Sequence, residues 1–198
     1  MYIIGLTGGI SSGKSAVAYI LRRFYHATTL DIDQVTDWLL KPGGELFDAY
    51  VRHFGNYVVT SNGVLNRRLI SEIIFNHPDE RQWINSVSHP ILLNKARDFL
   101  VDCADAGTNL VVLEVPLLFE AGWEHLFDEI WAVYVTRHTQ IERLMARDKL
   151  TEQQALRRIK SQMPVKEICR RADVKIKNLG GYPEIRRKVH KAMRGKKF

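Results

Sequence analysis

Short apolar runs alternate with amphipathic segments along most of the chain. Because polar residues do not alternate within these runs, they indicate strands buried on both faces of a parallel sheet. Five such strands are predicted, at residues 2–6, 27–30, 110–113, 130–135 and 174–176. Segments with helical periodicity lie between or after them, at residues 14–24, 139–147, 152–161 and 184–193. The alternation predicts an α/β fold with a five-stranded parallel sheet between layers of helices.

One long span, between Asp31 and Asn109, contains no convincing parallel strand. Its apolar positions predict helices at residues 34–40, 45–54, 67–75, 81–87 and 91–103, separated by Lys41-Pro42-Gly43-Gly44, Ser61-Asn62-Gly63 and His89-Pro90. A crossover between parallel strands needs only about a dozen residues. Residues 34–107 are therefore predicted to form a helical lobe inserted into a single domain, residues 1–198. The lobe follows the second strand, at the edge of the sheet where ligands bind.

The turn after the first strand reads Gly8-Gly9-Ile10-Ser11-Ser12-Gly13-Lys14-Ser15 and matches the phosphate-binding pattern G-x-x-x-x-G-K-[ST]. It follows a predicted strand and opens a predicted helix, as this motif requires. Gly8 and Gly13 allow successive N–H groups to point inward as an anion nest, and the helix start adds to the attraction. Lys14 is expected to reach the β- and γ-phosphates of a nucleotide, and the Ser15 hydroxyl to ligate Mg²⁺.

Two acidic positions accompany this loop. Asp31 and Asp33 end the second strand, and Asp33 is predicted to orient an attacking hydroxyl or to accept its proton. Either carboxylate could instead cap the helix that follows. Glu114 ends the third strand, where a carboxylate approaches Mg²⁺ in many nucleotide-binding proteins. A helix cap or a surface acid is the alternative for Glu114.

Arginines gather after the fourth strand. Arg143 and Arg147 are four residues apart and therefore share a helical face, from which they could neutralise a triphosphate. The alternative is a solvated face with Glu142 and Asp148 as partners. The position of the segment predicts a lid.

Composition limits the classes of ligand and the cellular compartment to be considered. The net charge of +7 suits either a nucleic-acid surface or a pocket for polyanionic small molecules. Cys103 and Cys169 lie far apart, and neither a secretory signal nor a membrane span is evident, so a cytoplasmic location is expected. The chain lacks D-x-x-G and N-K-x-D, the motifs of regulatory GTPases.

Taken together, the motifs resemble those of the dephospho-CoA kinase family. The resemblance runs in order through nearly the whole chain and includes Leu65-Asn66-Arg67, His89-Pro90-Ile91, Pro116-Leu117-Leu118-Phe119-Glu120 and Gln162-Met163-Pro164. It implies a three-layer P-loop kinase fold and transfer of the γ-phosphoryl group of ATP, with Mg²⁺, to the ribose 3′-hydroxyl of dephospho-CoA. It also implies that the helical lobe binds the acceptor and that residues 137–165 form the lid. Another nucleoside or nucleotide kinase, or a nucleic-acid-binding ATPase, is the alternative.

The resemblance also implies roles for individual residues. The predicted catalytic residues are Lys14, Asp33 and Arg147, and Ser15 is the predicted metal ligand. The predicted ATP-binding residues are Gly9, Ser11, Ser12, Gly13, Lys14, Ser15, Ala16, Arg143, Arg147 and Asn178. The predicted acceptor-binding residues are Asp33, Arg67, His89, Pro90, Pro116 and Leu117. ATP and dephospho-CoA are the expected partners; nucleic acid and membrane are not expected, and the oligomeric state is left open.

The chain departs from the family pattern at several positions. Ser11 replaces a glycine, and a positive φ there would cost about 1 kcal/mol. Glu114 replaces an aspartate, Ile32 an alanine, and Lys149 a glycine that is often found there. Asp37 stands where a basic residue is frequent. A changed rate or a changed fit of the acceptor is the expected consequence.

Overall fold

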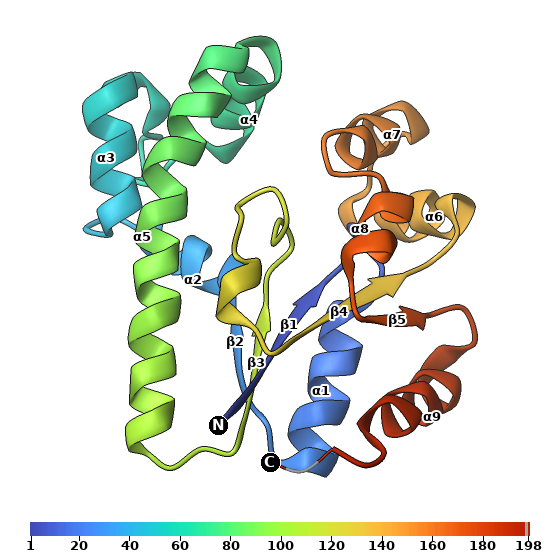
Figure 1. Ribbon diagram of the computed structural model, residues 1–198. Coiled ribbons are helices and arrows are strands. Elements are labelled where there is room, and N and C mark those ends of the chain that lie inside the picture. The colour runs from blue at the N-terminus through green and yellow to red at the C-terminus, as the bar shows by residue number, and fades with distance from the viewer. Residues whose placement is uncertain (197) are drawn as a thin grey trace. The chain divides into compact units, whose positions relative to one another are not determined.

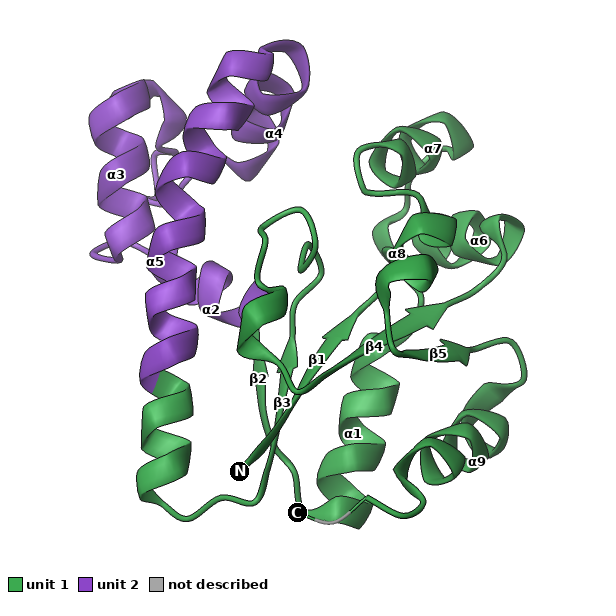
Figure 2. Ribbon diagram, viewed as in Figure 1, with its two compact units in different colours: residues 1–31, 99–198 green, residues 32–98 purple. Residues whose placement is uncertain are grey.

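The structure is a computed structural model, which describes residues 1–196 and 198. The chain divides into two compact units, residues 1–31 with 99–198 and residues 32–98, which Figure 2 shows in different colours. The second unit covers most of the lobe predicted at residues 34–107. Its role in binding the acceptor stays a prediction.

The first unit is built on five parallel strands (Figure 1). They are β1 (Tyr2–Thr7), β2 (Thr28–Asp31), β3 (Leu110–Glu114), β4 (Glu129–Tyr134) and β5 (Val174–Lys177), in the order β2-β3-β1-β4-β5. The predicted α/β fold with a parallel sheet is confirmed. All five residues of β3 are buried, which explains its unbroken apolar pattern.

The order of the strands fixes where a ligand can bind. Strand β1 lies between β3 and β4, so the chain runs to opposite sides of it. Such a switch point leaves a crevice beyond the carboxyl end of the central strand. The register places Glu114 beside both Leu6 and Asp31 at this edge. The phosphate-binding pattern begins immediately after β1, at the same edge.

The helices of the first unit follow the strands. They are α1 (Lys14–Tyr25), α6 (Arg137–Asp148), α7 (Glu152–Lys160), α8 (Val165–Arg171) and α9 (Gly181–Met193), with a 3₁₀ turn, η2 (Glu124–Leu126). Helices α1 and α9 lie side by side against the sheet, where their buried residues join those of β1 and β4 in one core (Figure 1). Helix α8 was not predicted from the sequence, because its seven residues are too few for a periodic pattern.

The second unit contains helices α2 (Ile32–Leu39), α3 (Glu45–Phe54) and α4 (Arg67–Asn76), a 3₁₀ turn, η1 (Asn56–Val58), and most of α5 (Pro78–Asp105). The predicted break at His89-Pro90 is wrong, because α5 continues through Pro90. Proline removes one N–H donor and crowds the carbonyl four residues earlier, here that of Ser86. Both Pro90 and Ser86 are exposed, so water can solvate that carbonyl. Buried residues Ile84, Ser88, Leu92 and Ala96 meanwhile anchor the opposite face.

No helix in the described part of the chain is long and apolar enough to cross a membrane.

Candidate active site: a phosphate-binding loop and its lid

The loop after β1 has the backbone that its pattern predicts. Gly13 has φ +91°, and a Cβ added there would lie 2.2 Å from the Nδ2 of Asn178. That amide donates a 2.8 Å hydrogen bond to the carbonyl of Ser12, while the Arg143 guanidinium donates to the Asn178 carbonyl at 3.2 Å. Asn178, which directly follows β5, and Arg143 of α6 therefore both support the loop. The predicted role of Asn178 in binding ATP stays a prediction.

The two side chains expected to bind phosphate and metal lie at the start of α1. The Nζ of Lys14 donates to the Gly8 carbonyl at 3.3 Å, so the ammonium group reaches back across the mouth of the loop. The Ser15 hydroxyl donates to Glu114 Oε2 at 3.2 Å. The Glu114 side chain is buried, which holds its carboxylate next to Ser15. The structure thus brings the loop and the acid of β3 together, as the sequence predicted.

These residues fit the coordination chemistry of Mg²⁺. Magnesium binds hard oxygen ligands and usually combines one or two carboxylates with substrate phosphates and water. Ser15 Oγ and Glu114 Oε2 supply two adjacent oxygens at the carboxyl end of the sheet, and Asp31 is paired with Glu114 in the register. Among the residues that the structure describes, no group of three or more His, Cys, Asp and Glu forms a closed metal cage. Ser15 and Glu114 therefore fit a Mg²⁺ ion whose other ligands are phosphates and water.

Two serines of the loop carry unsatisfied polar atoms. The hydroxyl oxygens of Ser11 and Ser12 are buried and have no hydrogen-bond partner among the described residues. A buried hydroxyl without a partner is costly, so native structures normally satisfy it with protein, water or ligand. The phosphate oxygens of a nucleotide would be suitable partners.

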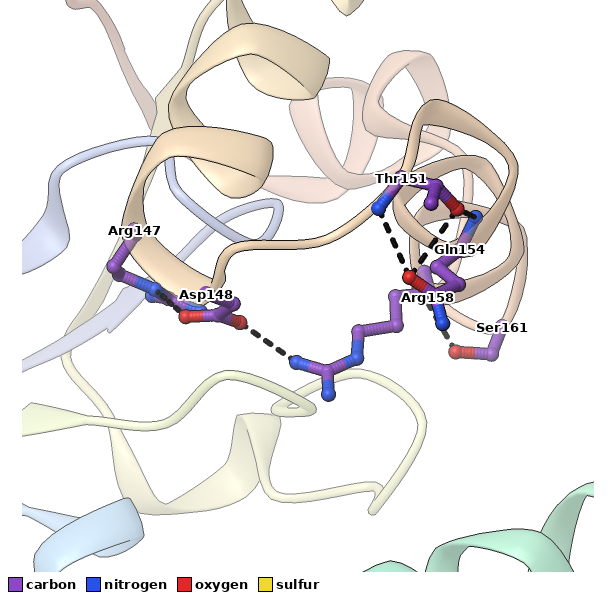
Figure 3. Close-up of polar contacts among 6 residues, drawn as sticks. All are labelled: Arg147, Asp148, Thr151, Gln154, Arg158 and Ser161. Carbon is purple, nitrogen blue, oxygen red and sulfur yellow. Dashed lines mark hydrogen bonds and ion pairs between the residues drawn. The ribbon is translucent and has the colours of Figure 1, made fainter.

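The predicted lid contains a pair of linked arginines (Figure 3). Asp148 accepts two hydrogen bonds from Arg147, at 2.7 and 3.1 Å, and a third from Arg158 of α7 at 2.7 Å. The hydrogen bond from Arg147, reinforced by the charges of both guanidinium groups, lowers the pKa of Asp148. The carboxylate therefore ties the end of α6 to α7. Thr151 and Gln154 form a capping box that starts α7 beside this pair.

The residues predicted to bind the acceptor divide between the two units. In the first, Pro116 follows β3 and its carbonyl accepts a 3.3 Å hydrogen bond from Thr7, while Leu117 is exposed. In the second, Asp33 is exposed in the first turn of α2, and Arg67 opens α4 and forms an ion pair with Asp37 at 2.5 Å. His89 and Pro90 lie within α5. These acceptor roles stay predictions.

Comparison with known proteins places this site in a family. The sequence profile described as dephospho-CoA kinase matches residues 2–184. The chain belongs to the dephospho-CoA kinase family. A dephospho-CoA kinase from Carboxydothermus hydrogenoformans is 38% identical over 187 residues, which cover 94% of this chain and 90% of that protein.

Two solved structures have a fold similar to that of this chain. The protein TT1252 from Thermus thermophilus superimposes with a TM-score of 0.80 and 31% identity, covering 97% of this chain and 95% of that one. The dephospho-CoA kinase from Campylobacter jejuni has a TM-score of 0.68 and 24% identity, covering 96% and 94%. The second likeness shows the fold alone, which is that of a P-loop kinase.

Sequence reasoning missed two residues that touch the loop. Gln140 of α6 and Gln162, between α7 and α8, both hydrogen bond to the backbone of Ile10. The available signal for Gln140 was a polar residue four positions before the buried Leu144, on the apolar face of α6. Gln162 lies in the Gln162-Met163-Pro164 stretch that carries the family resemblance, but that stretch gave it no role.

Proposed function

We propose that this chain transfers the γ-phosphoryl group of ATP to the ribose 3′-hydroxyl of dephospho-CoA. The observation that carries the proposal is the donor site itself. Lys14 bridges the loop, and Ser15 and Glu114 meet at the edge of the sheet, in a chain that matches the family over residues 2–184.

On the donor side, the chain supplies charge and positioning. The inward N–H groups of the loop and the Lys14 ammonium would bind the β- and γ-phosphates. Ser15 and Glu114 would hold Mg²⁺, which supplies charge neutralisation on the phosphate oxygens when bound. Arg143 and Arg147 would neutralise charge that builds up as the phosphoryl group moves, because developing charge is what such groups stabilise best.

On the acceptor side, Asp33 would orient the 3′-hydroxyl and accept its proton. Arg67, His89, Pro90, Pro116 and Leu117 would bind the acceptor. An oxygen–phosphorus bond forms to the hydroxyl as the bond to the β-phosphate oxygen breaks, and ADP leaves with the electron pair. Closure of the lid, residues 137–165, would keep water from competing with the hydroxyl.

The proposed partners are ATP and dephospho-CoA, with nucleic acid excluded. Both substrates are polyanions, and this accounts for the net charge of +7 without a nucleic-acid surface. Both cysteines, Cys103 and Cys169, are free thiols, as suits a reducing compartment such as the cytoplasm.

The test is ADP release from Mg-ATP in the presence of dephospho-CoA, nucleosides, nucleotides or DNA. We expect turnover with dephospho-CoA alone, and loss of at least about 100-fold in Lys14→Ala, because one preorganised charged donor contributes about that much. Turnover with a nucleoside or nucleotide instead would show that the proposed acceptor is wrong but that the chain is a small-molecule kinase. ADP release stimulated by DNA would contradict both the acceptor and the assignment as a small-molecule kinase.

A further inference from the structure

The tip of the phosphate-binding loop is a tight turn. The N–H of Ser12 donates to the carbonyl of Gly9 at 3.1 Å, so Ile10 and Ser11 are the two central residues. Ser11 has φ +59°. In the common type I turn this third residue has a negative φ, and a positive value there normally requires glycine. Ser11 therefore occupies a conformation that its own side chain disfavours.

The orientation of one peptide group separates these two kinds of turn. Rotating the Ile10–Ser11 peptide exchanges the positive φ at Ser11 for a negative one. The carbonyl and the N–H of a trans peptide point in opposite directions, so the rotation would also reverse the Ser11 N–H. That N–H belongs to the set that a loop of this pattern directs at phosphate.

A side chain from α6 holds this peptide. Gln140 Nε2 donates a 2.9 Å hydrogen bond to the Ile10 carbonyl. Gln140 is buried, with 3% exposure, and it leaves no room at Gly9, where an added Cβ would lie 2.6 Å from its Nε2. With the Ile10 carbonyl turned toward Gln140, the Ser11 N–H points away from it.

A second side chain holds the other polar group of Ile10. Gln162 Oε1 accepts a 2.8 Å hydrogen bond from the Ile10 N–H. Side-chain amides thus bind both backbone polar groups of Ile10. One amide belongs to a residue before α7 in the chain, and the other to a residue after it. The following residue, Met163, donates its N–H to Glu120 at 2.8 Å, which fixes the segment that carries Gln162.

We propose that Gln140 and Gln162 are positioning residues of the donor site, and that their hydrogen bonds to Ile10 keep the Ser11 N–H directed at phosphate. Neither residue needs to touch the nucleotide. Gln140 selects the peptide orientation, and Gln162 prevents Ile10 from turning. These hydrogen bonds matter more with Ser11 than they would with glycine at this position, because Ser11 resists the positive φ that glycine adopts freely. The inference rests on the proposed binding of ATP.

The first test uses nucleotide binding and a double-mutant cycle. We expect Gln140→Met to raise the Kd for ATP about fivefold, the value of one hydrogen bond of ~1 kcal/mol. In a Ser11→Gly background, where the positive φ is unstrained, the same substitution should change Kd less than about twofold. Equal losses in both backgrounds, or no loss in either, would overturn the role of Gln140. Thermal unfolding checks that each variant is folded, and Gln140→Leu, which also lacks the donor and carries no charge, should match Gln140→Met.

The second test needs no nucleotide. Hydrogen exchange of the Ile10 amide should be at least about tenfold faster in Gln162→Met, which lacks the acceptor. In Gln162→Glu, which keeps an acceptor oxygen, the amide should stay as protected as in the original chain. Unchanged exchange in Gln162→Met would overturn the role of Gln162. A chain that passes both tests but does not phosphorylate dephospho-CoA would contradict the proposed function and leave this inference standing.

Discussion

The donor loop and the residues assigned to the acceptor are built in different ways. Buried or half-buried side chains, Gln140, Gln162 and Asn178, hold the loop by direct hydrogen bonds to its backbone. On the acceptor side, Arg67 and Asp37 pair in the open, each with a side chain 58% exposed. The donor site is therefore set by the fold before ATP binds. The acceptor side chains carry groups that a ligand must still order.

This difference predicts that substitutions at the two sites change different kinetic constants. Changes at the donor loop should act on nucleotide binding, since its geometry is fixed in advance. Changes on the acceptor side should act on KM for dephospho-CoA, or on kcat alone where the group acts in the transition state.

The largest effect is expected for Asp33→Asn. If the Asp33 carboxylate accepts the proton of the 3′-hydroxyl, its loss should lower kcat by about 100-fold or more. The Kd for ATP should stay unchanged, because the proposed role of Asp33 is on the acceptor hydroxyl. The matched control is Asp37→Asn on the same helix, which removes an exposed carboxylate and should keep kcat. Normal turnover by the Asp33 variant would assign that carboxylate to the start of α2 alone.

Next in size is Arg67→Ala. If the Arg67 guanidinium binds a phosphate of the acceptor, its loss should raise KM for dephospho-CoA about tenfold, with KM for ATP unchanged. Arg68→Ala is the control, since Arg68 is the neighbouring residue, pairs with Glu72 along the helix and is 90% exposed. Equal effects at the two positions would mean that only general charge matters.

The ion pair between Arg67 and Asp37 allows a second measurement. Asp37 competes with any anionic ligand for Arg67, so Asp37→Asn should lower KM for dephospho-CoA about twofold. A rise in KM would instead show that Asp37 orients Arg67 for the ligand.

A smaller effect is expected at the lid, in Asp148→Asn. Without the carboxylate, the Arg147 guanidinium loses its two-bonded partner, and KM for ATP should rise about two- to fivefold. Glu72→Gln, which breaks an exposed pair in the other unit, should leave KM for ATP unchanged.

The same variant predicts a dependence of stability on pH. The pKa of Asp148 is lowered in the folded chain, so its contribution to stability is present above its ordinary pKa and is lost as pH falls through the lowered value. Thermal unfolding should therefore show Asp148→Asn less stable than the original chain at neutral pH. The gap should close below about pH 4. A gap that is constant with pH would assign the loss to packing.

Local sequence patterns predicted most helices and strands, but not the long-range side-chain contacts between them. The strands and the Lys14–Ser15 pair could be read from sequence, because burial and a phosphate-binding turn leave short-range signals. The continuous α5 could not, because the cost of Pro90 depends on whether the carbonyl of Ser86 faces water. Gln140 and Gln162 bind Ile10 across 130 and 152 residues, and no periodicity reports a contact over that separation. Ser11 was the exception, since the positive φ considered for it from the sequence is present, at +59°.

The smallest effect is expected for Ser11→Gly. A residue with a Cβ in this conformation costs about 1–2 kcal/mol, but glycine loses more freedom on folding. The free energy of unfolding should therefore rise by only about 0.5 kcal/mol, measured by denaturant unfolding. Ser11→Ala keeps the Cβ while removing the hydroxyl, and should give no such gain. Lys149→Gly, at φ +53° after α6, relieves the same strain away from the loop and should gain a similar amount. A gain at residue 149 without one at residue 11 would mean that the hydrogen bonds to Ile10 already offset the strain in the loop.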